Sequence, residues 1–183
     1  MEEDIMNRLS LGVSEFNGLI EQNKIYIDKT QFIKKMMDQG RKYYFLSRPR
    51  RFGKTLFIST LKDFFQGKKE LFKNTYIHDN WTDWDKYPVI RISLKKASNE
   101  NPEILKEDLL VIIENIAEKN NIELSEKGSY VVKFAQLIEK LSGNNNNNVV
   151  VLIDEYDAPI LKNLSNLGIA NKNREILQEF YNV

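Results

Sequence analysis

Apolar residues follow two kinds of spacing along the chain, and each predicts a different element. Helical spacing occurs in six segments, at 28–40, 54–65, 102–119, 129–141, 160–164 and 172–180. Nearly continuous apolar runs, typical of buried strands, occur at 43–46, 88–94 and 149–153, with a shorter strand-like piece at 24–27. Apolar strands separated by helices are typical of a parallel sheet covered on both faces. We therefore predict an α/β fold.

Residues that start or stop helices refine this assignment. Asp28 is placed to N-cap the first helix, with Gln31 completing a capping box, and Gly40 is placed to end it. Gly67 is placed to end the helix at 54–65, and Pro49 interrupts the chain after the apolar run 43–46. The predicted elements therefore have definite ends.

The most informative arrangement is the apolar run 43–46, a loop at 47–53 and a helix that opens with Lys54 and Thr55. This is the order that a phosphate-binding loop of the Walker A type requires. Its backbone N–H groups and the helix N-terminus, worth about half a positive charge, favour a bound phosphate. Lys54 would neutralise the phosphates during catalysis, and the Thr55 hydroxyl would bind Mg²⁺. The predicted cofactor-binding residues are Arg50, Arg51, Phe52, Gly53, Lys54, Thr55 and Leu56.

The loop departs from the pattern G-x-x-x-x-G-K-[ST]. Arg48 stands where the first glycine belongs, and Pro49 lacks an N–H donor. We expect such a loop to be less free to adopt positive φ than a glycine-rich one. Arg50 and Arg51 either contact phosphate or form a solvated face paired with nearby carboxylates, and the sequence favours neither hypothesis.

A second motif supplies the acidic groups that a phosphate loop needs. The apolar run 149–153 is followed by Asp154 and Glu155, the order of a Walker B motif. Asp154 would bind Mg²⁺, and Glu155 would act as the catalytic base on water, a role worth about 10²–10⁴ in rate. Ligands bind at the carboxyl ends of parallel strands, so we expect both motifs at one edge of the sheet. Asp157 and Pro159 are interpreted as the start of a helix.

Bulk properties exclude several classes of function. The chain has 183 residues, a formal net charge of +1, no cysteine and one histidine, which excludes disulfides and thiolate chemistry. Its first residues are acidic and no apolar run reaches membrane-spanning length, so we expect a cytoplasmic protein without a membrane partner. A near-neutral charge gives no footprint for nucleic acid.

Two stretches, 47–56 and 152–159, together resemble the bacterial and archaeal family of AAA-ATPase-like domain proteins, as do 12–16, 26–30 and 87–90. The resemblance implies ATP binding through Lys54 and Thr55, with acidic roles for Asp154 and Glu155. It also implies that the missing first glycine is normal, and that family members often carry a C-terminal nuclease-like domain, which we do not expect within residues 1–183. Residues 26–30 would lie near the nucleotide. We favour a helix cap for Asp28 and leave Lys29 and Thr30 open.

Taken together, we predict a P-loop NTPase-like three-layer sandwich with a mostly parallel sheet. Residues 1–40 would pack on the core, and residues 41–183 would form the ATPase-like domain, ending before the sensor strand that such ATPases usually carry. We also expect the chain to lack an arginine finger, which is worth about 10³–10⁵ in rate where it is present. This polypeptide alone would therefore bind ATP and Mg²⁺ yet hydrolyse ATP weakly or not at all.

Other functions stay open at this point. The runner-up is a non-hydrolysing nucleotide-dependent switch or interaction module, and a homo-oligomer is compatible with either function. A role in nucleic-acid processing would depend on parts beyond this chain. A small-molecule kinase is disfavoured, because Asp154 and Glu155 suit water activation better than phosphoryl transfer.

Overall fold

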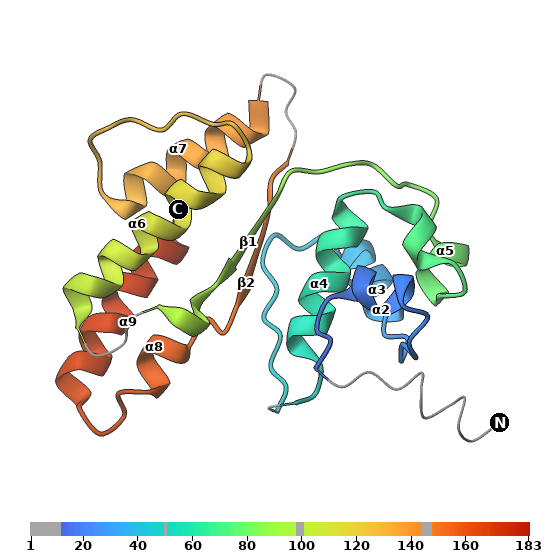
Figure 1. The fold of residues 1–183 in the computed structure, drawn as a ribbon, viewed down its shortest axis with the longest axis horizontal. Helices are drawn as coiled ribbons and strands as arrows, with labels where there is room; N and C mark the ends of the chain where they lie inside the picture. The colour runs from blue at the N-terminus through green and yellow to red at the C-terminus, as the bar shows by residue number, and fades with distance from the viewer. Residues whose placement is uncertain (1–11, 50, 98–100, 144–147) are drawn as a thin grey trace. The chain divides into compact units, whose positions relative to one another are not determined.

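The computed structural model describes residues 12–49, 51–97, 101–143 and 148–183. The chain divides into two compact units, Met1–Val89 (unit 1) and Ile90–Val183 (unit 2), and each is described by itself (Figure 1). The predicted domains, 1–40 and 41–183, have a different boundary and stay a prediction.

Unit 1 is helical in its described part. It contains α2 (Phe16–Glu21), α3 (Gln31–Gln39), α4 (Lys54–Phe65), the 3₁₀ helix η1 (Lys69–Phe72) and α5 (Tyr76–Asn80). Helix α2 packs against α4, and α3 packs against α5. Gly67, in the left-handed region at φ 67°, follows α4, and Gly40 at φ 57° follows α3, so both glycines end their helices as predicted.

Aromatic side chains form the centre of unit 1. Phe72 is fully buried, and its ring centroid lies 4.8 Å from that of Phe16 and 5.3 Å from that of Trp84. Phe64, on α4, meets Trp84 edge-on at 5.4 Å. Such pairs contribute about 0.5–1.5 kcal/mol beyond the area that they bury. The aromatic residues therefore tie α2, α4 and the chain after α5 together.

The first N–H groups of α5 donate hydrogen bonds to side chains of a segment that is distant in the sequence. The Asp28 carboxylate accepts from the Tyr76 N–H at 2.6 Å, and the Thr30 hydroxyl accepts from the Ile77 N–H at 2.9 Å. The prediction that Asp28 N-caps the helix at 28–40 is therefore wrong. Thr30 is the N-cap of α3, and Asp28 bonds to the Thr30 N–H instead, at 2.8 Å.

Two predicted strands in unit 1 are wrong. Residues 24–27 and 43–46 are irregular, and Tyr43 and Phe45 are 74% and 70% exposed. A strand is stabilised by a neighbouring strand, and the described part of unit 1 contains none. The hydroxyl of Tyr44 instead donates to the carbonyl of Met36 on α3.

Unit 2 contains the sheet. Strand β1 (Val89–Ser93) begins at the boundary between the units, and the 3₁₀ helix η2 (Leu94–Lys96), α6 (Pro102–Lys119), α7 (Tyr130–Ser142), β2 (Val150–Asp154), α8 (Ala158–Leu161) and α9 (Leu167–Tyr181) follow. The strands pair in parallel in the order β1-β2, as expected when long helical connections separate them. The predicted α/β class and the predicted strands at 88–94 and 149–153 are confirmed.

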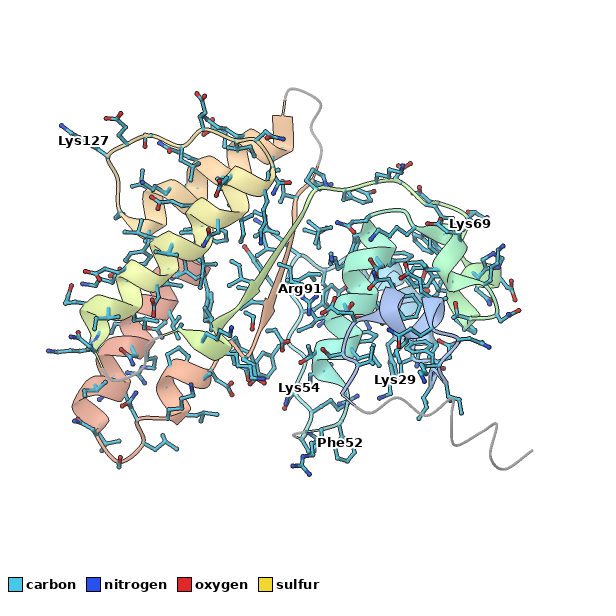
Figure 2. The ribbon with its side chains drawn as sticks, viewed as in Figure 1. Lys29, Phe52, Lys54, Lys69, Arg91 and Lys127 are labelled. Atoms are coloured by element: carbon cyan, nitrogen blue, oxygen red, sulfur yellow. The ribbon has the colours of Figure 1, made fainter. Side chains whose placement is uncertain are left out.

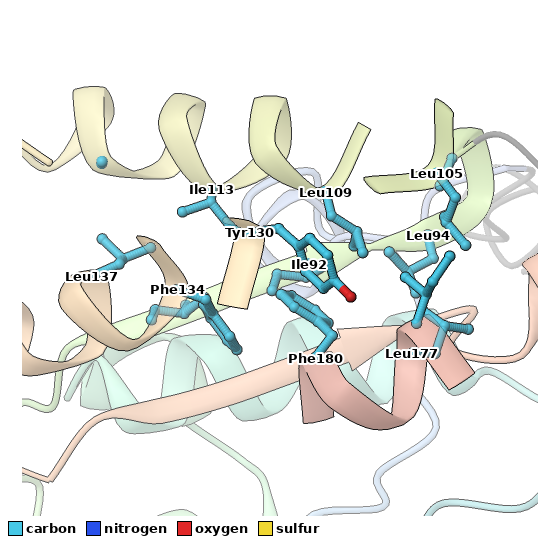
Figure 3. Packing of buried hydrophobic residues seen from close by; sticks show 14 residues of the cluster. Ile92, Leu94, Leu105, Leu109, Ile113, Tyr130, Phe134, Leu137, Leu177 and Phe180 are labelled. Atoms are coloured by element: carbon cyan, nitrogen blue, oxygen red, sulfur yellow. The ribbon is translucent and has the colours of Figure 1, made fainter. Parts of the chain in front are cut away.

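The core of unit 2 is mostly aliphatic. Ile90 and Ile92 of β1 are fully buried with residues of α6, α7 and α9, so these helices cover one face of the sheet (Figure 3). Phe180 of α9 stacks on Phe134 of α7, with ring centroids 4.5 Å apart. Caps set the helix starts, because the Asn101 side chain accepts from the Glu103 N–H and the Ser129 side chain from the Val132 N–H.

None of the helices in the described part of the chain is long and apolar enough to cross a membrane.

Candidate functional site

The predicted phosphate loop lies directly before α4 in unit 1. Gly53 adopts φ 76° and its carbonyl accepts the first hydrogen bond of the helix, from the Phe57 N–H at 2.9 Å. Arg51 adopts φ 66°, which is costly for a residue with a Cβ. The prediction that this loop is less free to adopt positive φ than a glycine-rich loop stays a prediction, although Arg51 does adopt positive φ. Arg50 lies outside the described residues.

The side chain of Lys54, in the first turn of α4, extends back to the loop. Its ammonium group donates to the carbonyl of Arg48 at 2.7 Å. Thr55 and Leu56 are half-buried, whereas Phe52 is 61% exposed. Lys54 and the loop backbone thus form one local structure, and Thr55 is accessible enough for its hydroxyl to bind a ligand.

Sequence reasoning did not assign Lys29 to this site. Its ammonium group donates to the Phe52 carbonyl at 3.3 Å, and the position that a Cβ on Gly53 would take lies 3.5 Å from the same nitrogen. Figure 2 shows Lys29, Phe52 and Lys54 at the N-terminal end of α4. The resemblance at 26–30 was the signal that could have identified Lys29, because it implies that this stretch lies near the nucleotide. Within the stretch, Lys29 is the residue whose side chain contacts the loop. Tyr26 instead packs edge-on against Phe16 at 4.9 Å, and Thr30 is fully buried.

Four cations lie at the loop, and the described part of unit 1 shows no salt bridge to any of them. They are Lys29, Arg48, Arg51 and Lys54, which lie on or against the loop. Arg48 instead donates to the backbone carbonyl of Ser47 at 3.1 Å. For the described arginines, the hypothesis of pairing with nearby carboxylates thus gains no support. A cluster of cations bonded to backbone carbonyls is suited to binding an anion.

The acidic pair ends β2 in unit 2. The Asp154 side chain is buried, 5% exposed, and its Oδ1 accepts from the Glu155 N–H at 3.0 Å. Glu155 is exposed and adopts φ 52°, another non-glycine residue in the left-handed region. The strained backbone turns the chain sharply after the strand, so the two carboxylates have different surroundings.

Helix α9 holds the turn that follows. The Tyr181 hydroxyl donates to the Tyr156 carbonyl at 2.8 Å, and the Asn173 side chain donates to the Pro159 carbonyl at 2.9 Å. Burial, and then the charge of Asp157, raise the pKa of the Tyr181 hydroxyl above its ordinary value, which keeps it a donor. Asp157 is the N-cap residue of α8 and Pro159 lies in its first turn, as predicted, although the Asp157 side chain makes no capping bond.

The predicted site residues are thus divided between the units. Arg51, Phe52, Gly53, Lys54, Thr55 and Leu56 belong to unit 1, and Asp154 and Glu155 belong to unit 2. Among the described residues, no group of three His, Cys, Asp or Glu side chains could hold a metal ion. Mg²⁺ commonly takes one or two carboxylates together with waters and substrate phosphates, so a hydroxyl such as that of Thr55 and a carboxylate such as that of Asp154 fit its chemistry.

Comparisons with known proteins agree with the resemblance noted in the sequence. Over 178 residues the chain is 36% identical to the "Uncharacterized protein in vnfD 5'region" of Azotobacter chroococcum mcd 1, in a match that covers 96% of this chain and 34% of that protein. The chain thus spans about a third of the length of this relative. No solved structure matches the chain. The model of the AAA-ATPase-like family, described as "Predicted AAA-ATPase", matches residues 10–183. The chain therefore belongs to the AAA-ATPase-like family.

Proposed function

We propose that this chain binds ATP with Mg²⁺ and is the ATP-hydrolysing part of its protein. The observation that carries the proposal is the loop before α4, where Lys29, Arg48 and Lys54 bond to backbone carbonyls and to no carboxylate of unit 1 among the described residues. Family membership supports a nucleotide as the anion. The loop backbone, Lys54 and the N-terminus of α4 would bind the phosphates.

The acidic pair supplies the remaining groups in this proposal. Thr55 and Asp154 would hold Mg²⁺, directly or through water, and Glu155 would orient and deprotonate the attacking water. The exposure of Glu155 fits a group that meets solvent water, and the burial of Asp154 fits a group with a fixed orientation. The proposed fold is a P-loop NTPase-like sandwich formed by residues 41–183, with residues 1–40 packing on it.

Binding is tested first, by titrating the chain with ATP and Mg²⁺ in a calorimeter. Lys54→Ala should weaken binding at least about tenfold, because it removes a charge-assisted hydrogen bond. Lys69→Ala is the matched control, since Lys69 is exposed and lies beyond the other end of α4 (Figure 2). Equal affinities of wild type and Lys54→Ala would remove the phosphate role of this loop.

Hydrolysis is tested with Glu155→Gln. This variant should bind ATP as the wild type does and lose turnover by about 10²–10⁴, the usual contribution of a general base. If the wild type binds ATP and shows no turnover that Glu155→Gln lowers, this chain by itself does not hydrolyse ATP, as a nucleotide-dependent switch would behave.

A further inference from the structure

The segment Asp28–Lys29–Thr30 is anchored on both sides of its lysine. Asp28 and Thr30 each accept a hydrogen bond from the first turn of α5, and Thr30 is fully buried. Asp28 also bonds to the Thr30 N–H, which closes a short turn around Lys29. The backbone of Lys29 is therefore held in place, and its side chain reaches the phosphate loop from outside the loop sequence.

The two lysines at the loop bond to opposite ends of the same stretch. Lys54 donates to the carbonyl of Arg48, and Lys29 donates to the carbonyl of Phe52. Both acceptors are neutral carbonyl oxygens. Each lysine would therefore form a stronger hydrogen bond with a phosphate oxygen, because that acceptor is negatively charged. An ammonium group has three donors, and in the described part of the chain the Phe52 carbonyl is the acceptor found for Lys29.

We propose that Lys29 is a second phosphate-binding lysine of this site. It lies on the segment before α3 and would bind phosphate together with Lys54. The inference rests on the proposed function, since it takes the ligand to be a nucleotide polyphosphate. Lys29 would add positive charge beside Phe52 and Gly53, at the other end of the loop from Arg48, which stands where the first glycine of the usual pattern belongs. The anchored turn at Asp28 and Thr30 would hold the lysine ready for the anion, which reduces the ordering cost of binding.

The test compares binding of ATP with Mg²⁺, and of inorganic tripolyphosphate, to the whole chain. Lys29→Met retains most of the aliphatic stem and removes the charge, so it should weaken both ligands about tenfold or more. Lys29→Arg should retain most of the affinity. Lys69→Met, the matched control, should bind both ligands as the wild type does. The melting temperature of each variant without ligand separates a binding role from a structural one, and it should stay at the wild-type value for Lys29→Met.

Each other result overturns a defined part of the proposal. If Lys54→Ala weakens ATP binding and Lys29→Met does not, the inference fails and the proposed function stands. If Lys29→Met and Lys29→Arg both lower the melting temperature and the affinity, Lys29 is a structural clamp on the loop, and the inference again fails alone. If the wild type binds neither ATP nor tripolyphosphate, the proposed function fails and the inference fails with it.

Discussion

The two units that carry the candidate groups differ in their cores. In unit 1 the basic groups lie on or against an exposed loop, in a unit with an aromatic core and with hydrogen bonds that the N–H groups of α5 donate to Asp28 and Thr30. In unit 2 the acidic groups end a strand whose neighbours form a mostly aliphatic core, and α9 fixes the turn after it. The comparison indicates that each unit combines an apolar core with hydrogen bonds beside its candidate groups, with an aromatic core in unit 1 and a mostly aliphatic core in unit 2.

The largest expected effect concerns the core of unit 2. Phe180 is fully buried and stacks on Phe134, so Phe180→Ala should destabilise unit 2 by about 3–5 kcal/mol through lost contacts and a cavity. Urea denaturation, with amide exchange in α7 and α9, measures the change. Leu167→Ala is the control on the same helix, because Leu167 is largely exposed. A loss below about 1 kcal/mol for Phe180→Ala would contradict a packed core around α9.

The corresponding change in unit 1 is polar. Thr30→Val keeps the shape of the side chain but leaves the buried Ile77 N–H without its acceptor, which should cost about 1–3 kcal/mol. Faster amide exchange at Ile77 and a lower urea midpoint are the expected results. Thr82→Val, at an exposed position, should change neither quantity. Unaltered exchange at Ile77 in Thr30→Val would show that this bond does not hold α5.

A smaller effect is expected at the turn after β2. Tyr181→Phe removes the donor to the Tyr156 carbonyl and should cost about 1 kcal/mol. The NMR signals of Tyr156 and Asp157 should shift, because the turn loses its bond to α9. Tyr43→Phe serves as the control, since Tyr43 is exposed. If the two variants have equal stability and the signals do not move, the Tyr181 hydroxyl does not position this turn.

The smallest effect concerns alkaline pH. Burial, more than any other cause, raises the pKa of Tyr130 and of Tyr181 above 10.0, and the hydrogen bond to Glu179 raises that of Tyr130 further. Above pH 10 the unfolded chain therefore binds fewer protons than the folded chain at these residues, and stability falls as pH rises. Urea midpoints between pH 9 and about 11 should fall less in the double variant Tyr130→Phe, Tyr181→Phe than in wild type. Parallel curves would contradict the raised pKa values.

Local signals predicted the longer helices and the paired strands well. The predicted helices at 54–65 and 102–119 coincide with α4 and α6, because apolar periodicity and end residues such as Gly67 act within a few positions. The strand at 43–46 was wrong because an apolar run does not identify a partner strand. Asp28 was assigned to the wrong helix, because its bond to Tyr76 joins residues 48 positions apart.

The candidate site divides in the same way. Gly53, Lys54 and Thr55 were recognisable because a phosphate loop is a contiguous sequence, and Asp154 with Glu155 because they follow an apolar strand. Lys29 was not assigned because its distance to Phe52 depends on tertiary folding. The roles of Tyr181 and Asn173 in holding the turn after β2 likewise depend on where α9 packs.

The positive charge at the predicted phosphate loop affects the choice of buffer for binding measurements. Charges of one sign on an exposed loop attract small anions from the buffer, and mobile ions screen them over about 8–10 Å at ordinary ionic strength. Under the proposed function, sulfate and phosphate would compete with nucleotide, and affinities measured in those buffers would be weaker than in chloride. The proposal likewise predicts that nucleotide binding becomes tighter as the salt concentration is lowered.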